Sequence, residues 1–141
     1  MKSITNHLFN KADALMEESL TQRVRRQNVI AGNIANSETP GYRSYGYDFE
    51  RQLQDSVDRG QHMLMKTTDE RHIRSPGVSM DGHIKADMYV KPTESIGNDG
   101  NSVDRDKEMS DMLSNQILYR ATIEALNRRL GLLKYGINGG R

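Results

Sequence analysis

The sequence DRDKEMSDMLSNQILYRATIEALNRRLGLLKYGI, residues 104–137, carries the clearest periodicity in this chain of 141 residues. Apolar side chains recur there at alternating spacings of three and four residues, which is the a/d pattern of a coiled-coil helix. Gln116 is the one polar member of the repeat. The repeat consists of Met109, Met112, Gln116, Tyr119, Ile123, Leu126, Leu130, Leu133 and Ile137. It predicts one long C-terminal helix.

The two ends of this helix carry their own signals. Asp104 is a plausible N-cap, and Asp106 and Glu108 place carboxylates in the first turn, where the helix dipole favours negative charge. Gly136 and Gly139 are typical of the region where a helix stops. Further apolar residues widen the stripe beyond a two-helix seam: Leu113, Ile117, Leu118, Ala121, Ala125 and Leu132.

The N-terminal segment also has a helical pattern, although a weaker one. Leu8 and Leu15 belong to its apolar stripe, and we expect both to lie on an interface. Pro40 disfavours helical geometry at the preceding residue, so the helix is predicted to end near residues 36–38. Gly41 then permits a sharp turn.

Asn33 and Asn36 near this helix end have two interpretations of equal weight. Asn36 lies where a helix C-cap would stand, so both side chains can belong to an exposed helix end. Alternatively, both amides form hydrogen bonds across packed helices and set their register.

The middle of the chain has the signals of turns and short extended pieces. It holds all three prolines and most of the glycines. Residues 45–49 and 84–90 alternate as short strands do, residues 49–57 have the spacing of a brief helix, and residues 80–83 form a turn signal. We therefore divide the chain into an N-terminal axial helix (1–38), a middle segment of loops and short strands (39–102) and a C-terminal axial helix (103–141).

The predicted fold class is mainly α. The two long helices pack as an antiparallel, coiled-coil-like pair, with a small irregular and β-containing segment between them. One such pair leaves apolar surface of the C-terminal helix uncovered, and stacking of subunits would cover it.

Several classes of function find no support in the sequence. The chain has no cysteine, its net charge is +1, and it lacks a stretch of about 20 apolar residues that could cross a membrane. It also lacks nucleotide-binding, nucleophile and zinc-protease motifs, and its four histidines have no ligand spacing. We expect no enzyme, metal or cofactor. The basic run Arg23–Arg26 is interpreted as a solvated face or a source of interface salt bridges rather than a phosphate contact.

The stretch AGNIANSETPGY, residues 31–42, resembles a motif of bacterial flagellar rod and hook proteins, which lies at the end of their N-terminal helix. Gly32 stands where those proteins often have Asn. Residues 48–53 and 99–119 resemble further elements of the family in the same order, and the short length resembles its proximal-rod branch. The residues assigned to the family motif and its turn are Asn33, Asn36, Thr39, Pro40, Gly41 and Tyr42.

The resemblance implies a non-enzymatic axial subunit of the proximal rod. Such a subunit assembles helically, connects the MS ring and export gate to the rest of the drive shaft, and transmits torque. Implied partners are copies of itself, rod proteins of the FlgC and FlgF type, the adaptor FliE, the MS-ring protein FliF and the flagellar type III export apparatus. Neither nucleic acid nor direct membrane insertion is expected.

The implied location is the rod of the flagellar basal body, in the periplasm. The N-terminus has no apolar core of a secretory signal, so export without a cleaved signal peptide is expected. Two alternatives remain: another rod subunit such as FlgC, and a coiled-coil interaction protein unrelated to flagella. The second would share the heptad stripe but would not need the Thr-Pro-Gly-Tyr corner.

Overall fold

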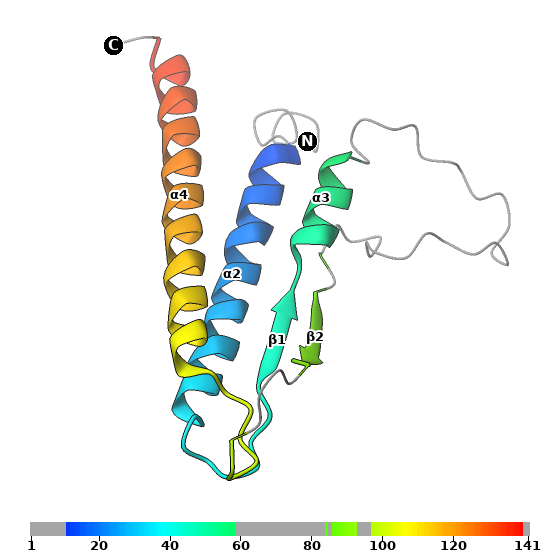
Figure 1. The fold of residues 1–141 in the computed structure, drawn as a ribbon. Helices are drawn as coiled ribbons and strands as arrows, with labels where there is room; N and C mark the ends of the chain where they lie inside the picture. The colour runs from blue at the N-terminus through cyan, green and yellow to red at the C-terminus, as the bar shows by residue number, and fades with distance from the viewer. Residues whose placement is uncertain (1–10, 59–83, 85, 93–96, 140–141) are drawn as a thin grey trace, which may run out of the picture.

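The computed structural model describes residues 11–58, 84, 86–92 and 97–139. Leu8 and the turn predicted at residues 80–83 lie outside these residues. Two long helices, α2 (Lys11–Ala35) and α4 (Arg105–Ile137), run antiparallel and side by side (Figure 1). With its 33 residues, α4 is about 50 Å long at 1.5 Å per residue. The mainly helical fold class is confirmed.

The bounds of the long helices follow the local signals in the sequence. Asp104 is the N-cap of α4, and its side chain accepts a hydrogen bond of 3.1 Å from the backbone N–H of Lys107. The predicted carboxylates occupy the first turn. α2 ends at Ala35, just before the predicted limit, and the chain turns through residues 36–38 toward Pro40.

The middle segment contains β1 (Tyr45–Asp48), α3 (Glu50–Asp58) and β2 (Asp87–Val90). The strands pair antiparallel, with Tyr45 opposite Val90 and Asp48 opposite Asp87. The two predicted strands and the short helix are thus confirmed, with β1 one residue shorter, β2 starting three residues later and α3 shifted by one residue. The side chain of Tyr89 crosses Gly46, where a Cβ atom would lie 2.5 Å from the tyrosine ring.

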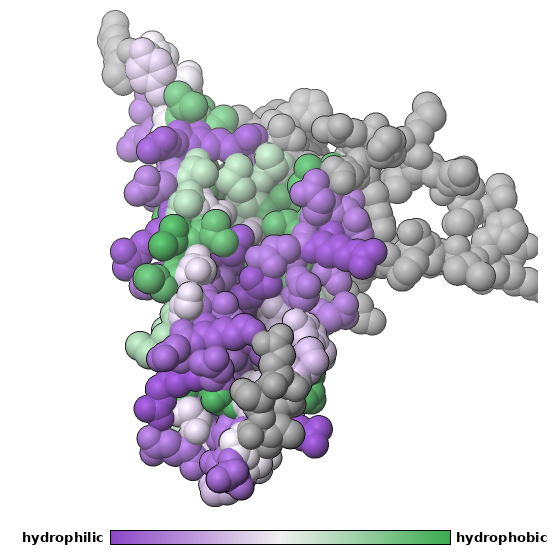
Figure 2. Space-filling model, in the orientation of Figure 1, coloured by the Kyte–Doolittle hydropathy of each residue, from purple (hydrophilic) through white to green (hydrophobic). Residues whose placement is uncertain are grey.

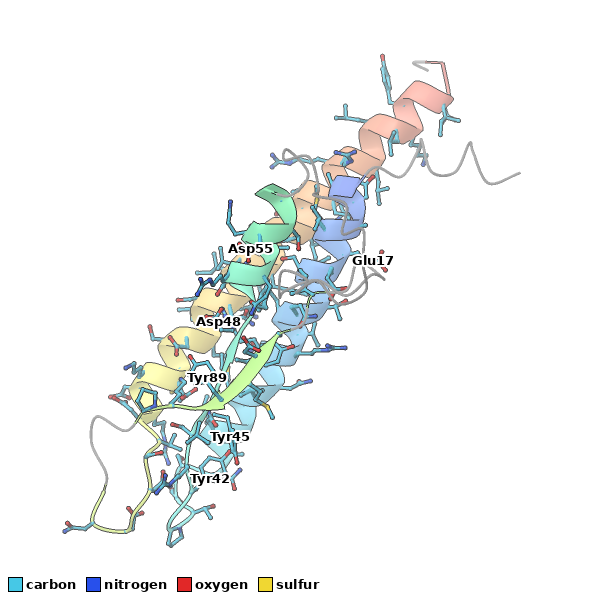
Figure 3. All side chains as sticks on the ribbon, turned by 90° about the vertical axis from the view of Figure 1, so that its right-hand side faces the viewer. Glu17, Tyr42, Tyr45, Asp48, Asp55 and Tyr89 are labelled. Carbon is cyan, nitrogen blue, oxygen red and sulfur yellow. The ribbon has the colours of Figure 1, made fainter. Side chains whose placement is uncertain are left out.

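α2 is the central element of the molecule. It contacts α4 on one side and β1 and α3 on the other (Figure 1). The side view shows the two strands passing in front of the helices, with Tyr89 and Tyr45 along them and Tyr42 below Tyr45 (Figure 3). α4 is therefore held to the rest of the fold mainly through α2.

The interior is unusually polar. Among the described residues, the buried apolar side chains are Ile30, Phe49 and Ile84. Gln22 is fully buried beside them, where its amide donates to the carbonyl oxygen of Ile84 (3.3 Å) and its oxygen accepts from the hydroxyl of Tyr47. Hydrogen bonds between distant segments therefore help to hold the elements together, as an apolar core does in most domains.

Candidate functional site

Asn33 joins the end of α2 to the start of β1. Its side chain is fully buried, its Nδ2 donates to the carbonyl oxygen of Tyr45 at 2.8 Å, and its Oδ1 accepts from the backbone N–H of Tyr45 at 3.0 Å. The amide thus pairs with a strand residue as a neighbouring strand would. Tyr42 adds a hydroxyl hydrogen bond of 3.3 Å to the same Oδ1.

Asn36 has a different role from Asn33. Its Nδ2 donates to the carbonyl oxygen of Gly32 at 2.8 Å, and its Oδ1 accepts from the Thr39 hydroxyl at 3.3 Å. These contacts stay within the helix end and its turn. The helix-end interpretation therefore describes Asn36, whereas Asn33 bonds across elements to a strand rather than to another helix.

The chain before α4 closes over the end of α2, through a residue to which the sequence analysis gave no role. Asn101 is buried, and its Nδ2 donates to the carbonyl oxygens of Asn36, Ser37 and Thr39 at 3.0, 3.0 and 2.8 Å. Its Oδ1 accepts from the backbone N–H of Val103 at 2.8 Å. One side chain thus binds the turn that follows α2, where the carbonyl oxygens of Asn36 and Thr39 also accept backbone N–H groups. We call residues 33–45 and 99–105 the corner.

Backbone hydrogen bonds complete the corner. The N–H of Gly41 donates to Asp99 (3.0 Å), and the N–H of Ser102 donates to Tyr42 (3.0 Å). Gly41 and Gly100 both have positive φ, 73° and 77°, which confirms the turn predicted at Gly41. Burial, together with the nearby Tyr45 and Glu108, raises the pKa of Tyr42 above its ordinary value.

The basic run on α2 is engaged within the chain. The guanidinium of Arg26 forms two hydrogen bonds of 2.7 Å to the carboxylate of Glu50 and lies 4.8 Å from the centre of the Phe49 ring. Arg23 lies 5.5 Å from the same ring, and burial lowers its pKa while the charge of Glu50 partly offsets this. These ion pairs lie within one chain and not at an interface, whereas the side chain of Arg25 is exposed.

The seam between α2 and α4 is half polar. Asn115 is buried, and its Nδ2 donates to the carbonyl oxygen of Arg23 (3.0 Å) and to Oε1 of Gln27 (2.9 Å). Arg129 forms an ion pair with the buried Asp13. These residues belong to a set with a spacing of seven, which we call the polar row: Glu108, Asn115, Thr122 and Arg129.

Glu108 begins the polar row at the β2 end of the molecule. Its side chain is 3% exposed and accepts a hydrogen bond of 2.7 Å from Nζ of Lys91. Burial alone would lower the pKa of Lys91, but the hydrogen bond and charge of Glu108, with help from Asp111, outweigh it and raise the pKa. The start of α4 is thereby tied to the strand segment.

The predicted heptad stripe is divided by the structure. One of its two rows is half-buried toward α2: Met112, Tyr119, Leu126 and Leu133. In the other row Ile123 is half-buried, whereas the remaining members are exposed: Met109, Gln116, Leu130 and Ile137. On α2, Leu15 is half-buried. The sequence predicts that both apolar rows face the partner helix. In the structure, the polar row faces α2 together with the row of Met112, and the row of Met109 is turned outward.

Apolar surface lies open at the end of the molecule away from the corner. A groove of about 490 Å³ runs between α2, α3 and α4, lined by Leu15, Leu53, Val57, Leu118 and Ala125 among others. Leu130, Leu132, Tyr135 and Ile137 of α4 are exposed there as well. Figure 2 shows hydrophobic side chains gathered along α4 and between the helices at this end, and a mostly hydrophilic surface toward the corner. We call this region the open end.

The described residues show features of an interaction surface rather than of a reactive centre. Within residues 11–58, 84, 86–92 and 97–139, no group of three His, Asp or Glu side chains is placed to hold a metal ion. No helix among the same residues has the length and apolar character that crossing a membrane requires.

Comparison with known proteins gives a consistent result. A family model described as flagella basal body rod protein matches residues 17–43. The chain is 34% identical to flagellar basal body rod protein FlgB of Proteus mirabilis (strain HI4320), over 81% of this chain and 84% of that protein. The FlgB protein of Bacillus subtilis (strain 168) is 32% identical over 95% of this chain and 98% of its own length. That of Salmonella typhimurium is 29% identical over 94% and 99%.

Proposed function

The chain belongs to the FlgB family of flagellar basal body rod proteins, and from this premise we propose how its surface serves the rod. It is a structural rod subunit and not an enzyme. We propose that the exposed apolar face of α4 is the surface by which one subunit packs against its neighbours in a helical assembly.

The observation that carries this proposal is the position of the apolar residues on α4. Met109, Leu130 and Ile137 are 57%, 40% and 71% exposed, although the heptad pattern marks them for burial. Apolar side chains exposed along one face of a helix are typical of interaction sites. The interface expected from the sequence also includes Gln116 and Ile123 of the same row, and Leu8 and Leu15 on the N-terminal segment. It further includes the row that is half-buried toward α2, which neighbours would reach only at its edge: Met112, Tyr119, Leu126 and Leu133.

We propose that the motif residues have a supporting role. Asn33 binds the end of α2 to β1, and Asn36 with Thr39 holds the helix end and its turn. Gly41 and Tyr42, which follow Pro40, bind the segment before α4. A fixed corner would set the angle between the two long helices, and neighbouring subunits could then pack in a regular way. The hydrogen bonds of Asn33 and Asn36 support this assignment.

The partners proposed are those of a proximal-rod subunit: copies of the chain, rod proteins of the FlgC and FlgF type, the adaptor FliE and the MS-ring protein FliF. The subunit would pass through the flagellar type III export apparatus and take its place in the periplasmic rod. There it would link the MS ring and export gate to the rest of the drive shaft and transmit torque. A long helix pair with an unsatisfied apolar face supports a role in such a shaft.

The substitution Leu130→Asp tests the interface. Leu130 is 40% exposed, so the charge costs the isolated fold little, but between packed subunits it would be buried without a partner. We expect cells carrying only this variant to lose swimming in soft agar while the protein is still produced. Asn127→Asp is the matched control, because it adds the same charge at an exposed position of the same helix. Normal swimming of the Leu130→Asp strain would contradict the proposal.

A further inference from the structure

α4 carries two alternative seams, and the structure uses the less apolar one. The apolar stripe predicted from the sequence offers one polar residue, Gln116, among its first eight members. The observed seam instead combines the polar row with Met112, Tyr119, Leu126 and Leu133, so half of its eight positions are polar. The two seams share a row and differ by about 50° of rotation, half of the 100° that separates successive residues in an α-helix.

Apolar burial alone favours the other seam, so another interaction must hold the observed one. The polar row supplies this interaction at three positions along α4. Glu108 binds Lys91, Asn115 binds the backbone of Arg23, and Arg129 pairs with Asp13. Two of these contacts end on α2 and one on the segment after β2. Each would be broken by the rotation, and buried polar groups would lose their partners.

We propose that the polar row sets the rotation of α4 about its own axis and so decides which apolar residues stay on the outside. Buried polar residues in helix seams are known to select one arrangement at a cost in stability. Here the cost is the exposure of Met109 and Leu130, and the gain is an apolar face that the chain does not bury by itself. That neighbouring subunits use this face rests on the proposed assembly role. The rotation of α4 does not depend on that role.

Partly unsatisfied atoms within the row support this assignment. Asn115 Oδ1 and Glu108 Oε2 are buried and have no hydrogen-bond partner among the described residues. Each such atom costs free energy. The observed seam is therefore not the one that burial of side chains alone would favour.

The test uses thiol reactivity as a measure of rotation, because the chain has no cysteine of its own. Met109→Cys reports on a position exposed in the observed seam and covered in the other. Met112→Cys reports on a position that both seams cover, and so detects loss of folding. Each reporter is placed singly in the full chain, and its labelling rate with a maleimide is measured.

Three backgrounds are compared. In the otherwise unchanged chain, the thiol at position 109 should react roughly tenfold faster than the thiol at position 112. Gln116→Leu completes the apolar stripe while the polar row stays intact, and the rates should not change. Adding Asn115→Ala and Arg129→Ala to Gln116→Leu removes two contacts of the row, and the thiol at position 109 should then react as slowly as the one at position 112.

Every other result overturns the proposal. Slow labelling at position 109 with Gln116→Leu alone would mean that apolar content, not the polar row, decides the rotation. Fast labelling at position 109 with slow labelling at position 112 in the triple variant would mean that the row is dispensable. Fast labelling at both positions would mean that the second seam does not form, and equal rates in the unchanged chain would mean that there is no seam to orient. Swimming assays of the same variants report separately on the assembly role.

Discussion

The corner and the open end are held in opposite ways. At the corner, one side chain, Asn101, donates to three carbonyl oxygens, and Asn33 pairs with both backbone groups of Tyr45. At the open end, apolar side chains of α4 such as Leu132 and Ile137 are 73% and 71% exposed. The corner is complete within one chain, whereas the open end has apolar surface left over.

The difference shows which part of such a subunit completes its contacts within one chain. Hydrogen bonds to a buried amide are specific in distance and direction, so they define a geometry without needing a large core. Apolar surface has no such direction and is satisfied by any well-packed neighbour. The chain therefore uses polar contacts to define its own shape and keeps apolar contacts for what packs against it.

The largest effect on this contrast is expected from Asn101→Asp. The substitution keeps the shape and the acceptor for Val103 but replaces the amide donor with a carboxylate facing three carbonyl oxygens. Loss of these hydrogen bonds in a buried place should lower the free energy of unfolding by about 3 kcal/mol or more. Urea denaturation followed by circular dichroism measures it. Asn98→Asp, at an exposed position nearby, should change stability by less than about 0.5 kcal/mol.

Hydrogen exchange compares the two regions directly. In the isolated chain, we predict partial disorder at the ends, since the surface that stabilises them is supplied by neighbours. Backbone amides of residues 36–45 that bond across the corner should exchange at least about 100-fold more slowly than those of residues 130–137, a difference of about 2.7 kcal/mol in opening free energy. Two uniformly protected terminal helices, by NMR or mass spectrometry, would contradict this.

Gly41→Val tests the turn within the corner. Gly41 has φ of 73°, and a Cβ atom placed there meets no atom within 4 Å, so the penalty is one of backbone conformation and not of space. A β-branched residue in this region should cost about 1–3 kcal/mol of unfolding free energy. Gly41→Asn should recover most of it, because Asn tolerates positive φ. Equal stability of the valine variant and the unchanged protein would contradict the requirement for glycine at this position.

The smallest effect concerns the Lys91–Glu108 pair, which ties the start of α4 to the strand segment. Glu108→Gln keeps the acceptor but removes the charge, and should cost about 1 kcal/mol near pH 8. The pKa of Lys91 is raised in the folded chain, so its contribution is complete below the ordinary value of 10.5 and is lost as pH rises through the folded value. The stability gap between the two proteins should therefore narrow above pH 10.5. If urea titrations gave the same difference in unfolding free energy at each pH, the predicted contribution of the Lys91–Glu108 pair would be contradicted.

Much of the fold follows from local patterns. The N-cap at Asp104, the glycine turn at Gly41 and the presence of the two short strands are encoded by residues next to each other, and the structure confirms them. The contacts of the corner do not follow from local patterns. Asn101 lies 62 to 65 residues from the carbonyls it binds, and no spacing within the sequence marks it as their partner.

The sequence alone determined that two long helices flank a turn-rich middle segment, because helix periodicity and turn chemistry are properties of neighbouring residues. Only the tertiary structure decided which row of α4 faces α2. The apolar spacing favours the seam with Met109 and Leu130, which differs from the observed one by a small rotation, so it does not predict the observed rotation of α4. Asn115 and Arg129 make the choice through contacts with Arg23, Gln27 and Asp13, which lie far away in the sequence and come together with α4 only when the chain folds.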